Sequence, residues 1–67
     1  MSVAKVSEIS ATSAKSFEDA IQQGLNRAAK TLRNIRGAWV KEQHVSCEGA
    51  RITEYRVNLM VTFVLDD

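Results

Sequence analysis

Residues 52–65 of the chain read ITEYRVNLMVTFVL, and their side chains alternate in character. Successive side chains of a β-strand point to opposite faces, so one face would carry the odd-numbered and the other the even-numbered residues. The odd-numbered set is apolar and consists of Tyr55, Val57, Leu59, Val61, Phe63 and Leu65. The even-numbered set is mixed and consists of Glu54, Arg56, Asn58, Met60, Thr62 and Val64. The pattern predicts a long strand over 52–65 with its odd face in a core.

Two further stretches have strand character. Residues 38–45 alternate loosely, and residues 46–51 connect them to the long strand through a segment that contains Gly49. This spacing is typical of a β-hairpin with a somewhat longer loop. Residues 3–11 mix apolar with polar side chains and indicate a short first strand. Ala38 and Val40 are expected to join the core beside the odd face of the long strand.

Between the first two strands the apolar period changes to that of a helix. Apolar or small residues recur every three or four positions, at Phe17, Ala20, Ile21, Gly24, Leu25, Ala28, Leu32 and Ile35. Ser16 followed by Asp19 resembles a capping box at the start. Residues 34–37 are expected to end the helix, with Gly37 as a candidate left-handed cap. Gly24 lies in mid-helix, which predicts a close approach to the packing partner.

Composition limits the class of protein. The chain has 67 residues, of which 45% are hydrophobic, a net charge of +1, one cysteine and one histidine. Residues 1–67 therefore form one domain, without an intramolecular disulfide or a Cys/His zinc cage. The charge balance argues against a nucleic-acid partner, and no apolar run predicts a membrane span or a signal peptide. We expect a cytoplasmic protein.

A chain this short buries a marginal core, so self-association is the expected remedy. The second sheet face would hold Trp39, Lys41, Gln43 and Val45 beside Arg56, Asn58 and Met60. An apolar patch of this kind is typical of an interface with another copy. The alternative is that these apolar residues are scattered surface positions, which are common on soluble proteins.

The chain resembles the dodecin family over nearly its whole length. The resemblance rests on residues 9–13 leading into Ser16 and Phe17, on residues 28–32 and on residues 55–65. It implies an α+β fold of order β-α-β-β, in which a three-stranded antiparallel sheet wraps around one helix. It also implies a hollow shell of twelve copies. Many members bind flavins stacked between tryptophans of two subunits, coenzyme A binding occurs in some bacterial members, and the family stores or scavenges without turnover.

The family's ligand residues map onto this chain as follows. The position of the flavin-stacking tryptophan falls on Gly37, and that of a glutamine falls on Arg56. Trp39 lies two residues later, on the same face but displaced by about 7 Å along the strand. We expect Trp39 either to stack on a flat ligand or to pack between subunits. Arg56 would bind a phosphate, or else pair with Glu42, Glu54 or an acid of a partner. Gly37 would leave room for a ligand or for another subunit's tryptophan.

Two functions follow. The first is binding, storage and sequestration of a flavin by a homododecameric shell, with FMN favoured over riboflavin because of Arg56. The second is a structural or ion-binding variant that has lost flavin binding. An enzyme is not expected, because Cys47 and His44 form no nucleophile–base arrangement and no acidic pair is positioned for acid–base work.

Overall fold

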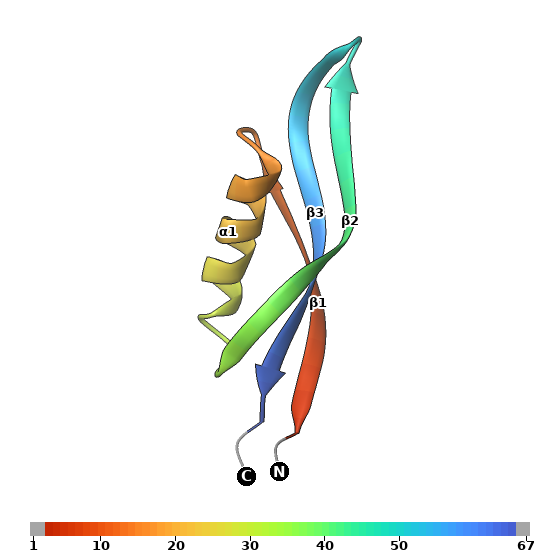
Figure 1. Cartoon of the computed structure of the whole chain (residues 1–67). Helices are drawn as coiled ribbons and strands as arrows, with labels where there is room; N and C mark the ends of the chain where they lie inside the picture. Colours follow the sequence, from red (N-terminus) through yellow and green to blue (C-terminus); the bar gives the residue numbers. More distant parts are fainter. Residues whose placement is uncertain (1–2, 66–67) are drawn as a thin grey trace.

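The structure is a computed structural model that describes residues 3–65. It contains β1 (Ala4–Ser13), α1 (Phe17–Ala28), β2 (Ile35–Glu48) and β3 (Arg51–Val64) in that order. This confirms the predicted β-α-β-β fold with three antiparallel strands (Figure 1). Among the described residues, no helix is both long and apolar enough to cross a membrane.

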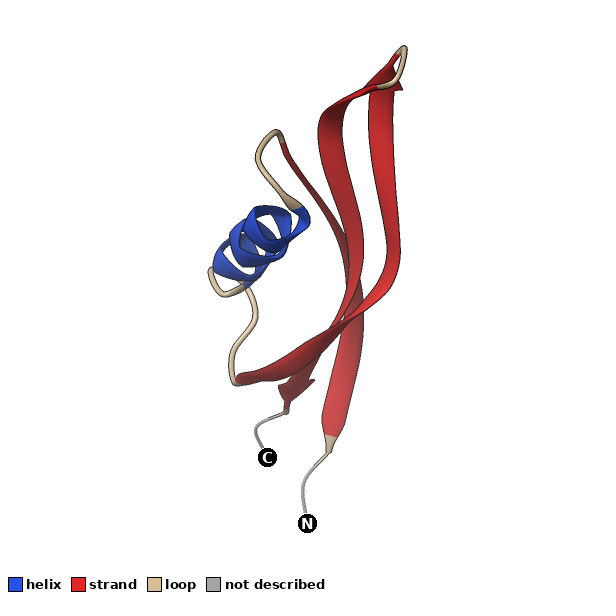
Figure 2. Cartoon of the chain, turned by 45° about the horizontal axis from the view of Figure 1, so that its top comes forward, coloured by secondary structure: helices blue, strands red, loops and turns tan. Residues whose placement is uncertain are grey.

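The long alternating strand lies at the centre of the sheet. The strand order is β1-β3-β2, and both neighbours pair with β3 in antiparallel register. Leu59, for example, is the Cα partner of Ile9 on β1 and of Val40 on β2. The helix packs on β1 and β3, while the β2–β3 hairpin extends beyond it, as Figures 1 and 2 show. The chain is therefore elongated, with extents of 51 × 19 × 13 Å.

The core lies between α1 and the odd face of β3, as the sequence predicts. Val57 and Val61 have no exposed surface, Leu59 is 1% exposed, and Ala20 of the helix covers them. Seven partly buried hydrophobic residues pack around this cluster, namely Ile9, Ala11, Phe17, Ile21, Leu25, Leu32 and Ile35. Phe17 also contacts Tyr55 edge to face, with ring centroids 5.1 Å apart. The burial of these side chains is the main stabilising contribution within one chain.

Gly24 allows the helix to approach the sheet closely, which confirms the prediction. A Cβ atom at this position would lie 3.1 Å from Cβ of Ala11 and 3.3 Å from Cδ1 of Leu59. Real Cβ atoms rarely have such short contacts. The loss of helix propensity at Gly24 is thus offset by tighter packing of α1 on β1 and β3.

The start of α1 is fixed by a small hydrogen-bond network. Ser16 is the N-cap, and its Oγ accepts from the backbone N–H of Asp19 at 3.0 Å. The Asp19 carboxylate accepts from Oγ of Ser13, the last residue of β1, and from Nε2 of Gln23. Oγ of Ser13 accepts in turn from the backbone N–H of Lys15. The network therefore ties β1, the turn and the first two turns of α1 together.

The end of the helix was predicted wrongly. The helix ends at Ala28, and the N–H groups of Lys30 and Thr31 donate to carbonyls three residues earlier, which tightens the chain out of the helix. The left-handed residue is Asn34, with φ of 59°, and not Gly37, which lies within β2. Asparagine tolerates this conformation, and the carbonyl of Asn34 accepts from the N–H of Val64.

β1 and β2 are longer than predicted, whereas β3 has the predicted length and is shifted by one residue. β1 continues to Ser13, β2 spans Ile35–Glu48 rather than 38–45, and only Gly49 and Ala50 separate β2 from β3. Gly49 has φ of 64°, a value that glycine adopts without strain. The tight turn allows pairing to continue to Glu48 and Arg51. A six-residue loop is therefore replaced by a two-residue one.

Ala38 and Val40 were expected to join the core, and this prediction is wrong. Both are exposed, Val40 at 37%. The physical reason is the strand order: α1 covers β1 and β3, and β2 lies at the far edge of the sheet. All fourteen positions of β2 are exposed except Ile35, which is half-buried.

Candidate ligand-binding face

The candidate site residues lie on the sheet face opposite α1, called the outer face below. A β-bulge in β2 determines which residues reach it. Trp39 is the Cα partner of Met60, and Val40 of Leu59, but Glu42 rather than Lys41 is the partner of Asn58. Lys41 is thus an extra residue, and the alternation of β2 is shifted beyond it.

The bulge corrects part of the predicted outer face. Gln43 and Val45 are the partners of Val57 and Tyr55, so they belong to the helix side of the sheet. Glu42 and His44 take their places on the outer face, opposite Asn58 and Arg56. Sequence alternation alone gave no sign of the bulge, because residues 38–48 alternate too loosely to locate an insertion.

Four rows of Cα partners run across the outer face through β1, β3 and β2. They are Val6–Thr62–Gly37, Glu8–Met60–Trp39, Ser10–Asn58–Glu42 and Thr12–Arg56–His44. Neighbouring strands lie about 4.8 Å apart, so each row is about 10 Å wide at the backbone. The rows therefore offer a floor of the size of a small aromatic ligand.

Trp39 lies on the outer face, as predicted, and is 53% exposed. Its row partner Met60 is half-buried. The indole thus has an apolar cross-strand partner, and about half of its surface is exposed to water. Such a side chain is suited either to stacking on a planar ligand or to packing on another subunit.

Gly37 lies in the row next to Trp39, opposite Thr62. A Cβ atom at Gly37 would meet no atom within 4 Å. The floor beside the indole is therefore open and carries only small side chains on β2 and β3.

Arg56 shares the outer face with Trp39, but the two side chains do not belong to adjacent rows. The four residues from Met60 to Arg56 correspond to about 13 Å along β3. Nη2 of Arg56 lies 3.7 Å from Oε1 of Glu54, so Arg56 pairs with an acid of its own strand, whereas a cross-strand or intersubunit pair was predicted. Both side chains are about half exposed, and an exposed pair of this kind contributes little to stability. His44, the Cα partner of Arg56, adds an imidazole to this end of the face.

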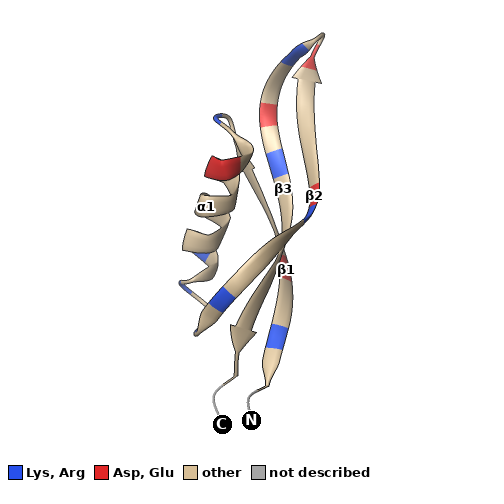
Figure 3. Cartoon of the chain, viewed as in Figure 1, with Lys and Arg blue, Asp and Glu red and all other residues tan. Residues whose placement is uncertain are grey.

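Two polar contacts on the outer face were not predicted. Nζ of Lys41 reaches across β3 to the carboxylate of Glu8 on β1, at 3.4 Å from each oxygen. Nδ2 of Asn58 donates to Oε1 of Glu42 at 2.9 Å. Basic and acidic residues are interspersed along the strands, as Figure 3 shows. The face therefore presents paired charges rather than a patch of one sign.

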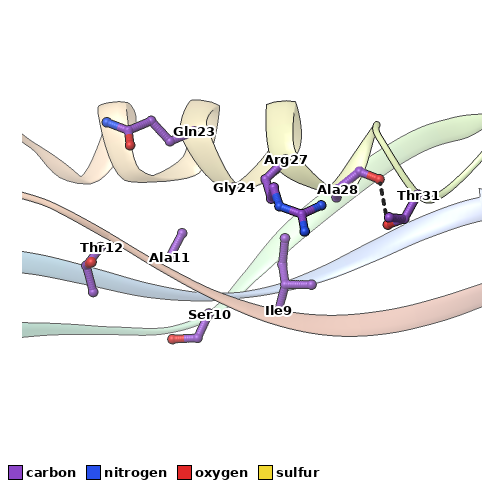
Figure 4. Close-up of a pocket in the computed structure, with 9 residues that line it drawn as sticks. All are labelled: Ile9, Ser10, Ala11, Thr12, Gln23, Gly24, Arg27, Ala28 and Thr31. Carbon is purple, nitrogen blue, oxygen red and sulfur yellow. Dashed lines mark hydrogen bonds between the residues drawn. The ribbon is translucent and has the colours of Figure 1, made fainter.

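A separate groove of about 450 Å³ runs between α1 and the free edge of β1 (Figure 4). Ile9 and Ala11 point toward the helix along its floor, and Arg27 extends over Ile9. Arg27 belongs to the last turn of α1, where a cation is favoured by the helix dipole. The groove lies on the opposite side of the sheet from Trp39, and sequence reasoning did not indicate it.

Residues 3–65 contain no group of three or more His, Cys, Asp or Glu side chains placed to hold a metal ion within one chain. Cys47 is a free, exposed thiol near the hairpin turn.

Comparison with known proteins points to one family. The family model described as Dodecin matches residues 3–66. The chain is 42% identical over 65 residues to a dodecin of Thermus thermophilus, covering 97% of this chain and 94% of the relative. It is 40% identical over 63 residues to a protein of Mycobacterium tuberculosis named calcium dodecin, covering 94% of this chain and 89% of that one.

Solved structures agree with the sequence matches. The crystal structure of the tt0972 protein from Thermus thermophilus superimposes with a TM-score of 0.94 at 40% identity, covering 100% of this chain and 98% of that one. The calcium dodecin of Mycobacterium tuberculosis, whose structure is described as having a novel calcium-binding site, gives a TM-score of 0.81 at 36% identity, covering 96% and 91%.

Proposed function

Because this chain belongs to the dodecin family, we propose that it is a binding and storage protein that holds a planar aromatic ligand of the flavin class on its outer face. The observation that carries this proposal is the half-exposed indole of Trp39 beside the open floor at Gly37. Stacking between two aromatic rings contributes about 0.5–1.5 kcal/mol beyond the burial of area. Sequestration of this kind needs no catalytic group.

The opposite end of the face suits an anionic group. Arg56 and His44 are Cα partners. The Arg56–Glu54 ion pair is exposed and weak, so an anionic group of a ligand can replace Glu54 as the partner of Arg56. Arginine binds phosphate through two parallel hydrogen bonds. The separation between the rows of Trp39 and Arg56 fits an extended ligand with a ring at one end and a phosphate at the other. We therefore favour FMN over riboflavin, with coenzyme A as a further ligand to test.

The functional unit in this proposal is a closed shell of identical subunits, twelve copies as in the family. Support within the chain comes from its large exposed hydrophobic side chains, which are Val3, Val6, Trp39, Val40, Val45, Ile52 and Leu65. Both outer strands of the sheet also have a free edge within one chain. Light scattering should give the mass of a dodecamer, and a monomer or dimer would contradict this part of the proposal.

Isothermal titration of the assembled protein with riboflavin, FMN and coenzyme A tests the ligand. Trp39→Ala should reduce flavin affinity by about 1–3 kcal/mol, as for a base stacked on an aromatic side chain. Arg56→Gln should weaken FMN more than riboflavin. Gly37→Trp restores the family's aromatic position and should strengthen binding. Absence of flavin binding to a correctly assembled protein would overturn the proposal.

An ion-binding function is the second candidate, because the relative named calcium dodecin is 40% identical to this chain. In this case carboxylates of several copies would form the site, since Ca²⁺ takes six to eight oxygen ligands. Calcium titration of the same assembled protein distinguishes the two functions. Calcium binding together with no response to flavins would favour this second candidate.

A further inference from the structure

Lys41 and Glu8 form a donor–acceptor pair beside the proposed ring position. The bulge places Lys41 outside the regular pairing with β3, and its ammonium crosses β3 to reach Glu8. Met60 is the Cα partner of both Glu8 and Trp39. Glu8 and the indole therefore stand at the two ends of one row, with Met60 between them and a backbone separation of about 10 Å, and the Lys41 side chain, which starts from the strand of the indole, brings its ammonium to the Glu8 end.

The pair is available to a ligand. The side chains of Lys41 and Glu8 are 50% and 47% exposed, and an exposed ion pair gains little net free energy in water. Lys41 can donate three hydrogen bonds, and an ionised Glu8 accepts only. Both groups thus keep free hydrogen-bonding capacity while they hold each other in place.

We propose that Lys41 and Glu8 together recognise the imide edge of a ring stacked on Trp39. In this arrangement the Lys41 ammonium donates to a ring carbonyl, and the Glu8 carboxylate accepts from the adjacent ring N–H. A fused ring that begins at the indole and lies over Met60 brings its far edge to the pair. The inference rests on the proposed function and names the groups that would select among planar ligands.

Other polar groups of the outer face are less suited to this edge. The Glu42 carboxylate is held by Asn58, and both belong to the next row. Arg56 and His44 lie one row further still. Lys41 and Glu8 are the described pair that combines a donor and an acceptor next to Met60.

The test compares riboflavin with 3-methylriboflavin, which lacks the imide N–H, on the assembled wild type and on Glu8→Met. For the wild type, methylation should reduce affinity about tenfold, the value of a charge-assisted hydrogen bond in a half-exposed site. For Glu8→Met, both ligands should bind with similar affinity. Glu48→Met, at the hairpin turn, is the matched control and should keep the wild-type ratio.

Lys41 is tested in the same titration. Lys41→Met should lower riboflavin affinity about tenfold, and Lys41→Arg should retain most of it, because a cation remains. Lys30→Met removes the same charge away from the outer face and should have no effect. Size and circular dichroism of each variant confirm that the assembly is intact.

The outcomes separate the two proposals. If the wild type binds riboflavin but Glu8→Met keeps the full methylation penalty, or Lys41→Met binds normally, the role of the pair is overturned while the proposed function stands. If the assembled wild type binds no flavin, the proposed function fails and the inference fails with it.

Discussion

The two faces of β3 differ in how much of their environment a single chain supplies. On the odd face, α1 covers Val57, Leu59 and Val61 completely. On the even face, no element among residues 3–65 covers Met60 and its neighbours, and Trp39 lies half exposed beside them. One face of β3 is thus buried within a single chain, and the other face remains partly exposed. The difference shows that burial on the odd face specifies the fold, while the outer face is free to specify contacts with other molecules.

The largest difference between the two faces is expected when a charged residue is introduced on each of them. Val61→Asp places a carboxylate in the only buried cluster described, which should cost more than about 4 kcal/mol and leave the chain unfolded by circular dichroism. Val6→Asp places the same charge on the outer face, where Val6 is 42% exposed. This variant should keep its secondary structure but assemble less well by sedimentation. Equal unfolding of both variants would show that the two faces are not independent.

A smaller difference is expected between Gly24, which faces the core, and Gly37, which lies on the outer face. Gly24→Val forces a side chain against Ala11 and Leu59, which should destabilise the protein by about 2–3 kcal/mol in denaturant melts. Gly37→Val meets no atom within 4 Å at its Cβ and should change stability by less than about 0.5 kcal/mol. Adding Ala11→Gly to Gly24→Val should recover part of the loss. No recovery would mean that the close approach is not the cause.

Sequence reasoning predicted the odd face well because burial and alternation are local signals that reinforce each other. Val57, Leu59 and Val61 could be assigned to the core from their spacing, and Gly24 from its place on the helix. The end of α1 was missed, because Leu32 and Ile35 keep the helical spacing although they reach the core from a turn and from the start of β2. The apolar period reports which residues are buried, and it does not require them to share one helix.

The candidate site was predictable only in part. Trp39, Gly37 and Arg56 were assigned to a common face, and the register places them there. The bulge at Lys41 had no sequence signal, so the exchange of Gln43 and Val45 for Glu42 and His44 was missed, as was the Lys41–Glu8 pair. Contacts of this kind depend on the registers of two strand pairs at once. A single-residue insertion in one strand changes them without altering the composition of either.

The helix cap gives a smaller effect than the glycines. Ser16→Ala removes the acceptor for the N–H of Asp19 and should cost about 1 kcal/mol of stability. Ser10→Ala, on the outer face, removes a hydroxyl at an exposed position and should change stability by less than about 0.5 kcal/mol. Thermal melts of the two variants at neutral pH measure the difference. Equal melting temperatures would contradict the capping role of Ser16.

The smallest expected effect is the change in folding stability at low pH that arises from Asp19 at the start of α1. The hydrogen bond from Ser13 holds the pKa of Asp19 below its ordinary value, with smaller contributions in the same direction from Gln23 and Lys15. A carboxylate whose pKa is lower in the folded state stabilises that state above the pKa of the unfolded chain. This contribution is lost as the pH falls through the folded-state pKa, because the protonated form then gains nothing from folding.

Stability measured by denaturant melts should therefore decrease from neutral pH to below the ordinary pKa of aspartate, and the decrease should be smaller in Asp19→Asn. Glu18→Gln changes the neighbouring acid, leaves the Ser13–Asp19 hydrogen bond in place and serves as the matched control. A profile of Asp19→Asn identical to that of the wild type would show that the network at the start of α1 does not contribute through its charge.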